Sequence, residues 1–367
     1  MVHQVWTADP PGGEDRTMSS ETERWLNNMT LIGFTDKRGH AWHYRQGQQG
    51  DEPNHYPQAI PVADVRRRLF NFDFAEGTVE SQYVHPVTGE CLLTVDDTRK
   101  TIIRPRGAFG EGDPGAVLYV PKDGFTIHGY DRWLVQHVED VLDASADDIG
   151  IASAGLLKDG AIAWVQFELP DSREVEGFAH RPFITAATSV NGDLSSTYLS
   201  GTQAVVCDNT LAAATSERGA RTIKVKHSRH SEFKIGDVRE HLEVQVQRVG
   251  DAFDAEIADL IAQPVTDRTW GTFLNTFAPV PVEKGRSRTL AESRRDTLDR
   301  LWRSDERVSP WRGTAFGVLQ AVNTYNHHHK AARGSRVQRN MLNAVTGQFA
   351  KDDADALTML NRVLASV

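Results

Sequence analysis

The chain has 367 residues, of which 39% are hydrophobic and 25% are charged, and its formal net charge is −9. These proportions are those of a globular protein with a sizeable core, and no apolar run approaches the roughly 20 residues of a membrane-spanning helix. We therefore expect no membrane partner. The negative net charge argues against indiscriminate binding to nucleic acid.

The charge is distributed unevenly along the chain. Residues 1–200 contain 17 Lys and Arg against 30 Asp and Glu, a balance of −13, whereas residues 201–367 contain 24 against 20, a balance of +4. A chain with an acidic half and a basic half can present a local basic face. The alternative is that solubility alone requires the charge and that its distribution is incidental.

The N-terminal residues and the cysteines indicate the compartment. Residues 1–18 are polar and include Pro10-Pro-Gly-Gly13, which predicts a disordered arm without a signal peptide. The two cysteines, Cys91 and Cys207, form no disulfide framework and fit a reducing cytoplasm.

The first half of the chain predicts helices and hairpins. Helices are expected from residue 20 and over 60–70 and 131–142. Strands are expected at 83–85, 91–95 and 101–104, separated by turns at Thr88-Gly89 and Asp96-Asp97. Lys158-Asp-Gly160 and Asn191-Gly-Asp193 predict two further hairpins, with strands at 149–156, 161–169, 183–190 and 194–199. A strand at Val205-Val206, a polar turn and a helix from Thr210 follow.

Helical periodicity dominates the remainder. Helices are predicted over 235–264, 267–277, 288–303, 314–329, 335–346 and 352–365, and the proline-containing linker 279–285 is the best domain boundary. The fold class is therefore α+β, an antiparallel β meander packed with helices and followed by a mainly helical C-terminal region. We divide the chain into a disordered arm (1–18), an α+β core (19–278) and a helical region (286–367).

The segment 218–234 is strongly basic, with six Lys or Arg, two His and one acid. In a strand, the alternation at Ile223–His227 would place Lys224 and Lys226 on one face, a spacing that suits a phosphate backbone. Phe233 and the planar groups beside it can stack on unpaired bases. The alternative is a solvated strand face. The candidate nucleic-acid-binding residues are Arg221, Lys224, Lys226, His227, Arg229 and His230, joined by Arg336 and Arg339 from a second cluster at 330–339.

The second cluster follows the triplet His327-His-His329, whose composition invites a metal site. Adjacent residues of a helix point in different directions, and no cysteine lies nearby to complete a tetrahedral set. An exposed or capping run of histidines fits better, so we assign no metal.

An enzymatic interpretation rests on Cys207 as a nucleophile with His227 as its base. The favoured interpretation of Cys207 is a small buried residue before a capped helix. The chain has no Walker lysine motif, no dinucleotide fingerprint and no HExxH motif. We assign no catalytic residue and no cofactor.

Three segments of the chain carry motif residues, namely Thr202, Val205, Val206, Cys207, Asn209, Thr210 and Leu211, then Lys224–Ser228, then Gly313, Thr314, Ala315, Ala321, Val322, Asn323 and Tyr325. With these residues the chain resembles the phage/plasmid-like protein family, whose domain has no known function. Gln203 and Ala204 replace the usual proline and arginine, so a phosphate-binding role for that arginine does not carry over. Residues 30–44 look like versions from phages of actinobacteria.

The resemblance implies a role in DNA metabolism, because family members often lie near phage replication and recombination genes. The outline is similar to phage single-strand annealing proteins, which is an analogy of fold alone. We expect a non-enzymatic phage protein of the host cytoplasm that binds single-stranded DNA and promotes its annealing, with stacking by Phe233 or Tyr325. The alternatives are a regulatory factor that binds a host or phage protein through its acidic half, and an enzyme that acts on nucleotides or DNA through Cys207. A homo-oligomer is compatible with all three.

Overall fold

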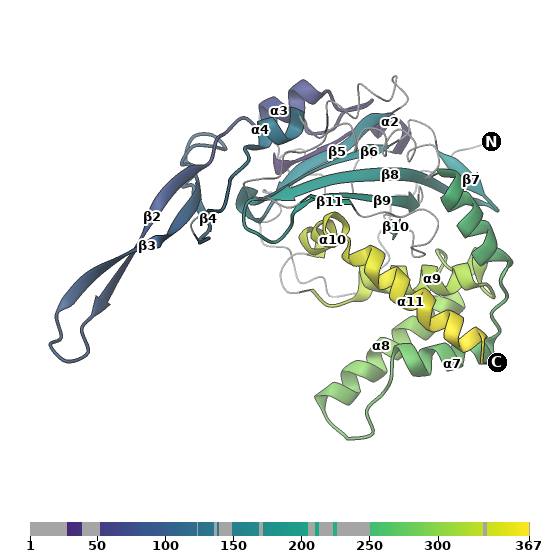
Figure 1. The fold of residues 1–367 in the computed structure, drawn as a ribbon. Coiled ribbons are helices and arrows are strands. Elements are labelled where there is room, and N and C mark those ends of the chain that lie inside the picture. Colours follow the sequence, from purple (N-terminus) through teal and green to yellow (C-terminus); the bar gives the residue numbers. More distant parts are fainter. Residues whose placement is uncertain are drawn as a thin grey trace.

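The computed structural model of the chain describes residues 28–38, 52–122, 124–135, 138, 149–168, 172–204, 210–212, 223–225, 250–332 and 336–366. In these ranges an antiparallel sheet carries helices on both faces, a long β arm extends from one end, and a helical region follows (Figure 1). The predicted α+β class is confirmed.

The main sheet has the strand order β1-β5-β6-β8-β9-β10, with β7 paired to β8 and β11 paired to β9. Its strands are β1 (Thr30–Ile32), β5 (Gly150–Leu157), β6 (Ile162–Glu168), β7 (Arg173–Val175), β8 (Phe178–Ser189), β9 (Ser196–Ala204), β10 (Thr210–Ala212) and β11 (Ile223–Val225). Both hairpins predicted for this region are confirmed. In the first, Lys158 and Asp159 adopt φ values of 50° and 57°, the left-handed conformation that a tight hairpin turn requires.

The helix predicted to begin at Thr210 is wrong, because β10 occupies Thr210–Ala212. Leu211 pairs with Thr202 of β9, so this segment supplies partners for the backbone groups of that strand. An unpaired strand edge is costly, and its pairing overrides the helix preference of the alanine-rich run. Residues 205–209, where a strand and a turn were predicted, lie outside the described residues.

The arm consists of β2 (Ala75–Val84) and β3 (Cys91–Arg104), and β4 (Ala116–Tyr119) joins β3 at the base of the arm. The turn predicted at Asp96-Asp97 is wrong, since β3 continues through it. Asp96 accepts hydrogen bonds from the backbone and hydroxyl of Thr98, as it would in a turn. Thr78 pairs with Lys100 and the next residue, Val79, pairs with Asp96, so residues 97–99 of β3 form a bulge that accommodates this irregularity without ending the ladder.

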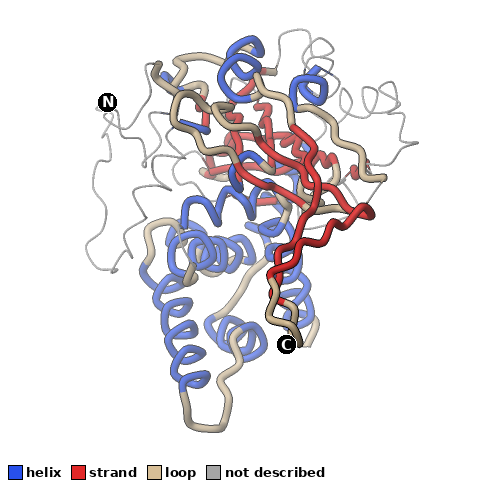
Figure 2. Tube along the Cα trace, turned by 90° about the vertical axis from the view of Figure 1, so that its left-hand side faces the viewer, coloured by secondary structure: helices blue, strands red, loops and turns tan. Residues whose placement is uncertain are grey.

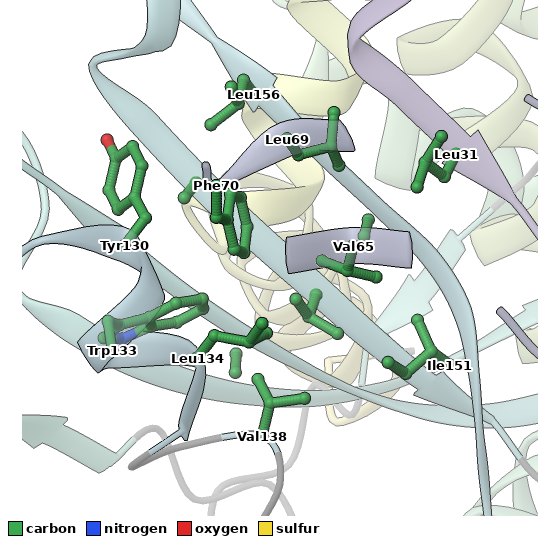
Figure 3. Packing of buried hydrophobic residues seen from close by; sticks show 14 of the residues in the cluster. Leu31, Val65, Leu69, Phe70, Tyr130, Trp133, Leu134, Val138, Ile151 and Leu156 are labelled. Carbon is green, nitrogen blue, oxygen red and sulfur yellow. The ribbon is translucent and has the colours of Figure 1, made fainter. Parts of the chain in front are cut away.

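One face of the main sheet packs against α3 (Val62–Leu69) and α4 (Tyr130–Leu134), as Figure 3 shows. These helices confirm the prediction over 60–70 and the beginning of the helix predicted at 131. Leu69, Phe70 and Trp133 lie in this core together with Ile102 from the arm. Arg104 at the base of the arm pairs with Asp113 and donates to the backbone oxygen of Asp159 at 2.8 Å. The base of the arm is therefore fixed to the core.

The C-terminal region is helical, and every helix predicted from residue 250 onward is confirmed. Residues 250–262 are helical and are followed by α7 (Asp267–Phe277), α8 (Arg286–Ser304), α9 (Ala315–Thr324), a π-helical turn η5 (Tyr325–His329), α10 (Arg336–Val345) and α11 (Gln348–Leu364). α7 and α8, which flank the linker 279–285, contribute to one hydrophobic cluster with α9 and α11. Figure 2 shows these helices gathered below the sheet. No helix in the described ranges is long and apolar enough to cross a membrane.

A buried polar network joins the helical residues 250–262 to the sheet. His180 of β8 is fully buried and lies 2.9 Å from a carboxylate oxygen of Asp254, which also pairs with Arg173 of β7. Burial lowers the pKa of His180, and the carboxylate of Asp254 opposes that shift. Breaking such a network by removing one partner leaves a buried group uncompensated, so it fixes the position of the helix.

Substitution of Gly155 tests how the main sheet packs against the helix α10. A Cβ at Gly155 would lie 2.1 Å from Cη2 of Trp164, its partner on β6, and Trp164 packs against Val345 of α10. Gly155→Ala is expected to displace the indole and to lower the free energy of unfolding by about 1–3 kcal/mol in denaturant titrations. Gly271→Ala is the matched control. Nothing lies within 4 Å of its added Cβ, so the helix α7 should gain up to about 1 kcal/mol. Equal effects of the two changes would contradict the packing described.

Candidate nucleic-acid interface

The candidate site is built on the π-helical turn η5, which continues directly from α9. Its defining bond is the one in which the backbone N of Lys330 donates to the backbone O of Tyr325 at 2.8 Å, five residues earlier. α10 also holds this turn, because the side-chain amide of Asn340 donates to the backbone O of His327 at 3.0 Å. Single π-helical turns occur frequently at functional sites.

Arg339 holds the turn in place. Its guanidinium donates to the backbone oxygens of Asn326, Lys330 and Ala331 at 2.8, 2.7 and 3.3 Å, and to the Asn340 side chain. Burial lowers the pKa of Arg339, and the neighbouring Arg336 acts in the same direction. Since its donors are engaged within the protein, Arg339 is a positioning residue in this structure, and the sequence-based phosphate role of this side chain stays a prediction.

Three arginines from three elements surround the end of η5. Burial lowers the pKa of His329, and the charges of Arg300 and Arg307 lower it further, with Arg336 as a smaller contribution. Burial also lowers the pKa of the neighbouring His328 to about 4, again with Arg307 and Arg336 contributing. α8, the segment after it and α10 therefore bring positive charge to one place on the molecule.

The countercharges at this place are fewer than the cations. Arg307 makes two hydrogen bonds to Asp305, at 2.9 and 2.8 Å, and Lys330 lies 3.6 Å from Asp352. Arg300 is exposed, and no ion pair of its side chain is found among the described residues. Among the described residues, Arg307 and Lys330 each face one carboxylate and no ion pair is found for Arg300, so the local charge is positive on a chain that is acidic overall.

The histidines of the turn are neutral at pH 7. Burial lowers the pKa of His327 to about 3, with His328 and Arg339 contributing, and its ring stacks on Phe349 of α11 with centroids 3.9 Å apart. Among the described residues no group of His, Cys, Asp and Glu is arranged to hold a metal ion. Neutral imidazoles beside arginines offer planar surfaces and hydrogen bonds without a charge of their own.

The motif residues of the third segment shape α9. Thr314 caps the helix, because its hydroxyl accepts from the backbone N of Gly317 at 3.1 Å. Tyr325 packs beneath the guanidinium of Arg294, 5.7 Å from the ring centroid, and Asn323 is 1% exposed with no partner for either polar side-chain atom among the described residues. A buried unsatisfied amide costs about 1–3 kcal/mol per group, so apolar packing alone does not account for an asparagine at this position. Gly313 precedes the cap with φ 90°.

The structure places only some of the residues predicted from sequence. Lys224 lies in β11 opposite Thr197, and the same cross-sheet row continues through Ala187 to Trp164. Ala187 and Trp164 belong to the cluster that packs against α10, so the row leads to the helix that bears Arg336. Thr202 and Thr210 lie in β9 and β10. Arg221, Lys226, His227, Arg229, His230, Cys207 and Asn209 lie outside the described residues.

Sequence reasoning missed Arg300 and Arg307. Their spacing to the histidines is about 20 to 30 residues, and the alternating charges of residues 286–304 are those of an ordinary solvated helix face. Only the packing of α8 and of the segment after it beside η5 brings them to the histidines.

The depressed pKa values of His327 and His328 predict a pH dependence. Both folded values lie below the ~6.5 of an unfolded histidine, so the unfolded chain binds protons first as the pH falls. The two neutral histidines make their full contribution to the free energy of unfolding above about pH 6.5. As the pH falls from about 6 to 4.5, each should lower that free energy by up to about 1.4 kcal/mol per pH unit.

Denaturant titrations across this range check the dependence. His327→Gln is expected to make the dependence shallower. Phe349→Leu, which removes the ring contact but keeps the titrating group, should lower stability at every pH without changing the slope. An unchanged slope in His327→Gln would contradict the assignment.

Comparison with protein families shows a match over residues 118–346 to the domain of unknown function DUF932. The matched region begins within β4 and extends through α10, so it contains the main sheet except β1, together with η5 and all three arginines. The arm formed by β2 and β3 precedes it. Neither the comparison with curated proteins nor that with solved structures found a match. Since the match covers more than half of the chain, the protein belongs to the DUF932 family.

Proposed function

We propose that the chain binds single-stranded DNA at the surface formed by the C-terminal half of α8, η5 and the first turn of α10. The observation that supports this most is the convergence of Arg300, Arg307 and Arg336 on the exposed end of η5. Phosphate oxygens are the ligands that guanidinium groups recognise best, and a backbone of phosphates requires several such groups near one another.

The neighbouring groups favour an unpaired strand. His329 is exposed and His328 is half-buried beside the arginines, so planar groups and cations alternate on the surface. Bases of a single strand can stack on such groups, whereas a closed duplex presents only its phosphates and groove edges. The −9 net charge of the chain confines the attraction to this face.

The segment around Lys224 supports a longer interface. Its row in the sheet leads to α10, and the basic residues from Arg221 to His230 lie next to it in the chain. An extended strand of DNA would pass from the arginines on α8 and α10 toward β11.

The biological setting is part of the proposal. The resemblance of the Gly313–Tyr325 motif to phage and plasmid proteins, and of residues 30–44 to those of actinobacterial phages, supports a phage protein in the cytoplasm of an infected or lysogenic host. Accessory work in replication or recombination, including annealing of complementary strands, fits a protein that holds single strands without reading their sequence.

Replacing Arg300 tests the arginine cluster. Arg300→Glu is expected to weaken the binding of a fluorescent oligonucleotide at least about tenfold in anisotropy titrations, because it removes one phosphate contact and introduces repulsion. The slope of log affinity against log salt should also fall by about 0.7 or more. Arg303→Glu is the control on the same helix, since Arg303 is exposed and pairs with Asp299. An equal loss of oligonucleotide affinity in both variants would show a general charge effect and would contradict the proposed site.

The basic strand is tested separately. Lys224→Glu combined with Lys226→Glu is expected to abolish oligonucleotide binding at physiological salt, as measured by the same anisotropy titration. Unchanged affinity would remove this segment from the interface. Circular dichroism and thermal unfolding of the double variant establish that the sheet is intact, so that a loss of binding is not a loss of fold.

A further inference from the structure

The distal part of the arm exposes an unusual amount of apolar surface. Five of the ten large hydrophobic side chains exposed in the described residues lie there, namely Tyr83, Val84, Val87, Leu93 and Val95. Val87 at the tip is 87% exposed and Leu93 is 62% exposed. Monomeric proteins rarely collect such residues on one projecting element unless it meets a partner.

The topology explains why this surface is uncovered. β4 pairs only with Ile102–Arg104, at the base of the arm. The distal residues Val79–Val84 of β2 and their partners on β3 therefore have no third strand beside them among the described residues. A lone two-stranded hairpin is marginally stable in water, and apolar residues on it gain from being covered. The arm projects away from the sheet and the helical region, so these parts of the same chain do not cover it (Figure 1).

The charge of the distal arm narrows the choice of partner. Residues 79–97 contain four acids, Glu80, Glu90, Asp96 and Asp97, and no Lys or Arg. Such a surface repels nucleic acid and anionic lipid. Its partner must present apolar residues surrounded by positive charge.

The end of the helical region where α7 turns into α8 has these properties. Val282 is 90% exposed and Leu290 is 61% exposed, and they are two of the remaining five exposed large hydrophobics in the described ranges. Residues 282–295 contain five cations (Lys284, Arg286, Arg288, Arg294 and Arg295) and two acids (Glu283 and Glu292). Of the exposed cations, Arg288 is paired with Glu292, and no ion pair of Lys284 or Arg286 is found in the described part of the chain.

We propose that the arm of one copy docks on the α7–α8 end of a second copy, with the apolar side chains in contact and the acids of residues 79–97 facing Lys284 and Arg286. The two surfaces differ, so the contact is heterologous. Repetition of such a contact generates a ring if the rotation closes and a filament if it does not. Two copies that exchanged arms reciprocally would close a dimer, whereas the proposed repeated, head-to-tail contact assembles the chain beyond a dimer.

The exposed thiol of Cys91 on the arm offers a direct test. In Leu290→Cys on a Cys207→Ser background, which all the crosslinking variants share, a short bismaleimide is expected to join Cys91 of one copy to the thiol introduced on α8 of the next and to give a ladder of dimers, trimers and larger species. Arg303→Cys places the thiol at the other end of α8 and should give no ladder. The Cys91→Ser, Leu290→Cys double variant should give none either, because the arm then has no thiol. Crosslinking of the unaltered chain through Cys91 alone would show an arm-to-arm contact and would overturn the proposal.

Charge reversal provides the second measurement. Glu80→Arg with Asp97→Arg, and separately Lys284→Glu with Arg286→Glu, should each weaken self-association at least about tenfold in sedimentation or light-scattering titrations, because like charges then meet. Mixing the two variants should restore assembly with the variants alternating, because the reversed arm then meets the reversed α7–α8 end and the unaltered arm meets the unaltered end. All four positions are remote from the core clusters, and thermal unfolding verifies folding. A monomer at every concentration of the unaltered chain, or variants that do not recover on mixing, would overturn the inference.

Discussion

Burial of α9 along its whole length is the constraint on which the helical region depends. All ten of its residues are buried, and most are small or apolar, so α7, α8 and α11 pack around it. A helix that ends inside a protein leaves carbonyl groups that need donors. η5 continues the ladder for one wider turn, and Arg339 and Asn340 supply further donors. The position of α10, and with it that of Arg336, follows from this requirement.

Positive charge at the end of a buried helix has two physical explanations. The carbonyl end of a helix carries a partial negative charge, so cations gather there for stability alone. Arg339 fits that explanation, because its guanidinium is directed onto backbone oxygens. Arg300 does not, since it lies on another helix, is exposed, and adds to the positive field that lowers the pKa of His329. Positive charge beyond that which stabilises the helix carbonyl groups is available to bind a ligand.

Local patterns predicted the elements that local forces determine. The apolar stripe of 267–277 and the Lys158-Asp-Gly160 turn are specified within a few residues, and both were found. Segments whose partners are distant were interpreted wrongly. Thr210–Ala212 became a strand because β9 required pairing, and Asp96-Asp97 continued as a strand because a bulge at residues 97–99 of β3 leaves its pairing with β2 intact on both sides. Among the residues of the site, Arg336 could be predicted because it lies in a basic cluster of the sequence. Arg300 could not, since nothing short of the packed helices relates it to the histidines.

Segregation of charge allows one acidic chain to carry both proposed surfaces. α8 rises by about 1.5 Å per residue, so Leu290 and Arg300 are roughly 15 Å apart along its axis. That distance exceeds the Debye length of about 8 Å at physiological salt, so acids brought to the N-terminal end of α8 are largely screened from its C-terminal half. An arm from a neighbouring copy would neutralise Lys284 and Arg286 without reducing the attraction of Arg300 for phosphate. Because both surfaces lie on one rigid helix, each added copy would extend the line of arginines at a fixed spacing, which is the geometry that a continuous single strand requires.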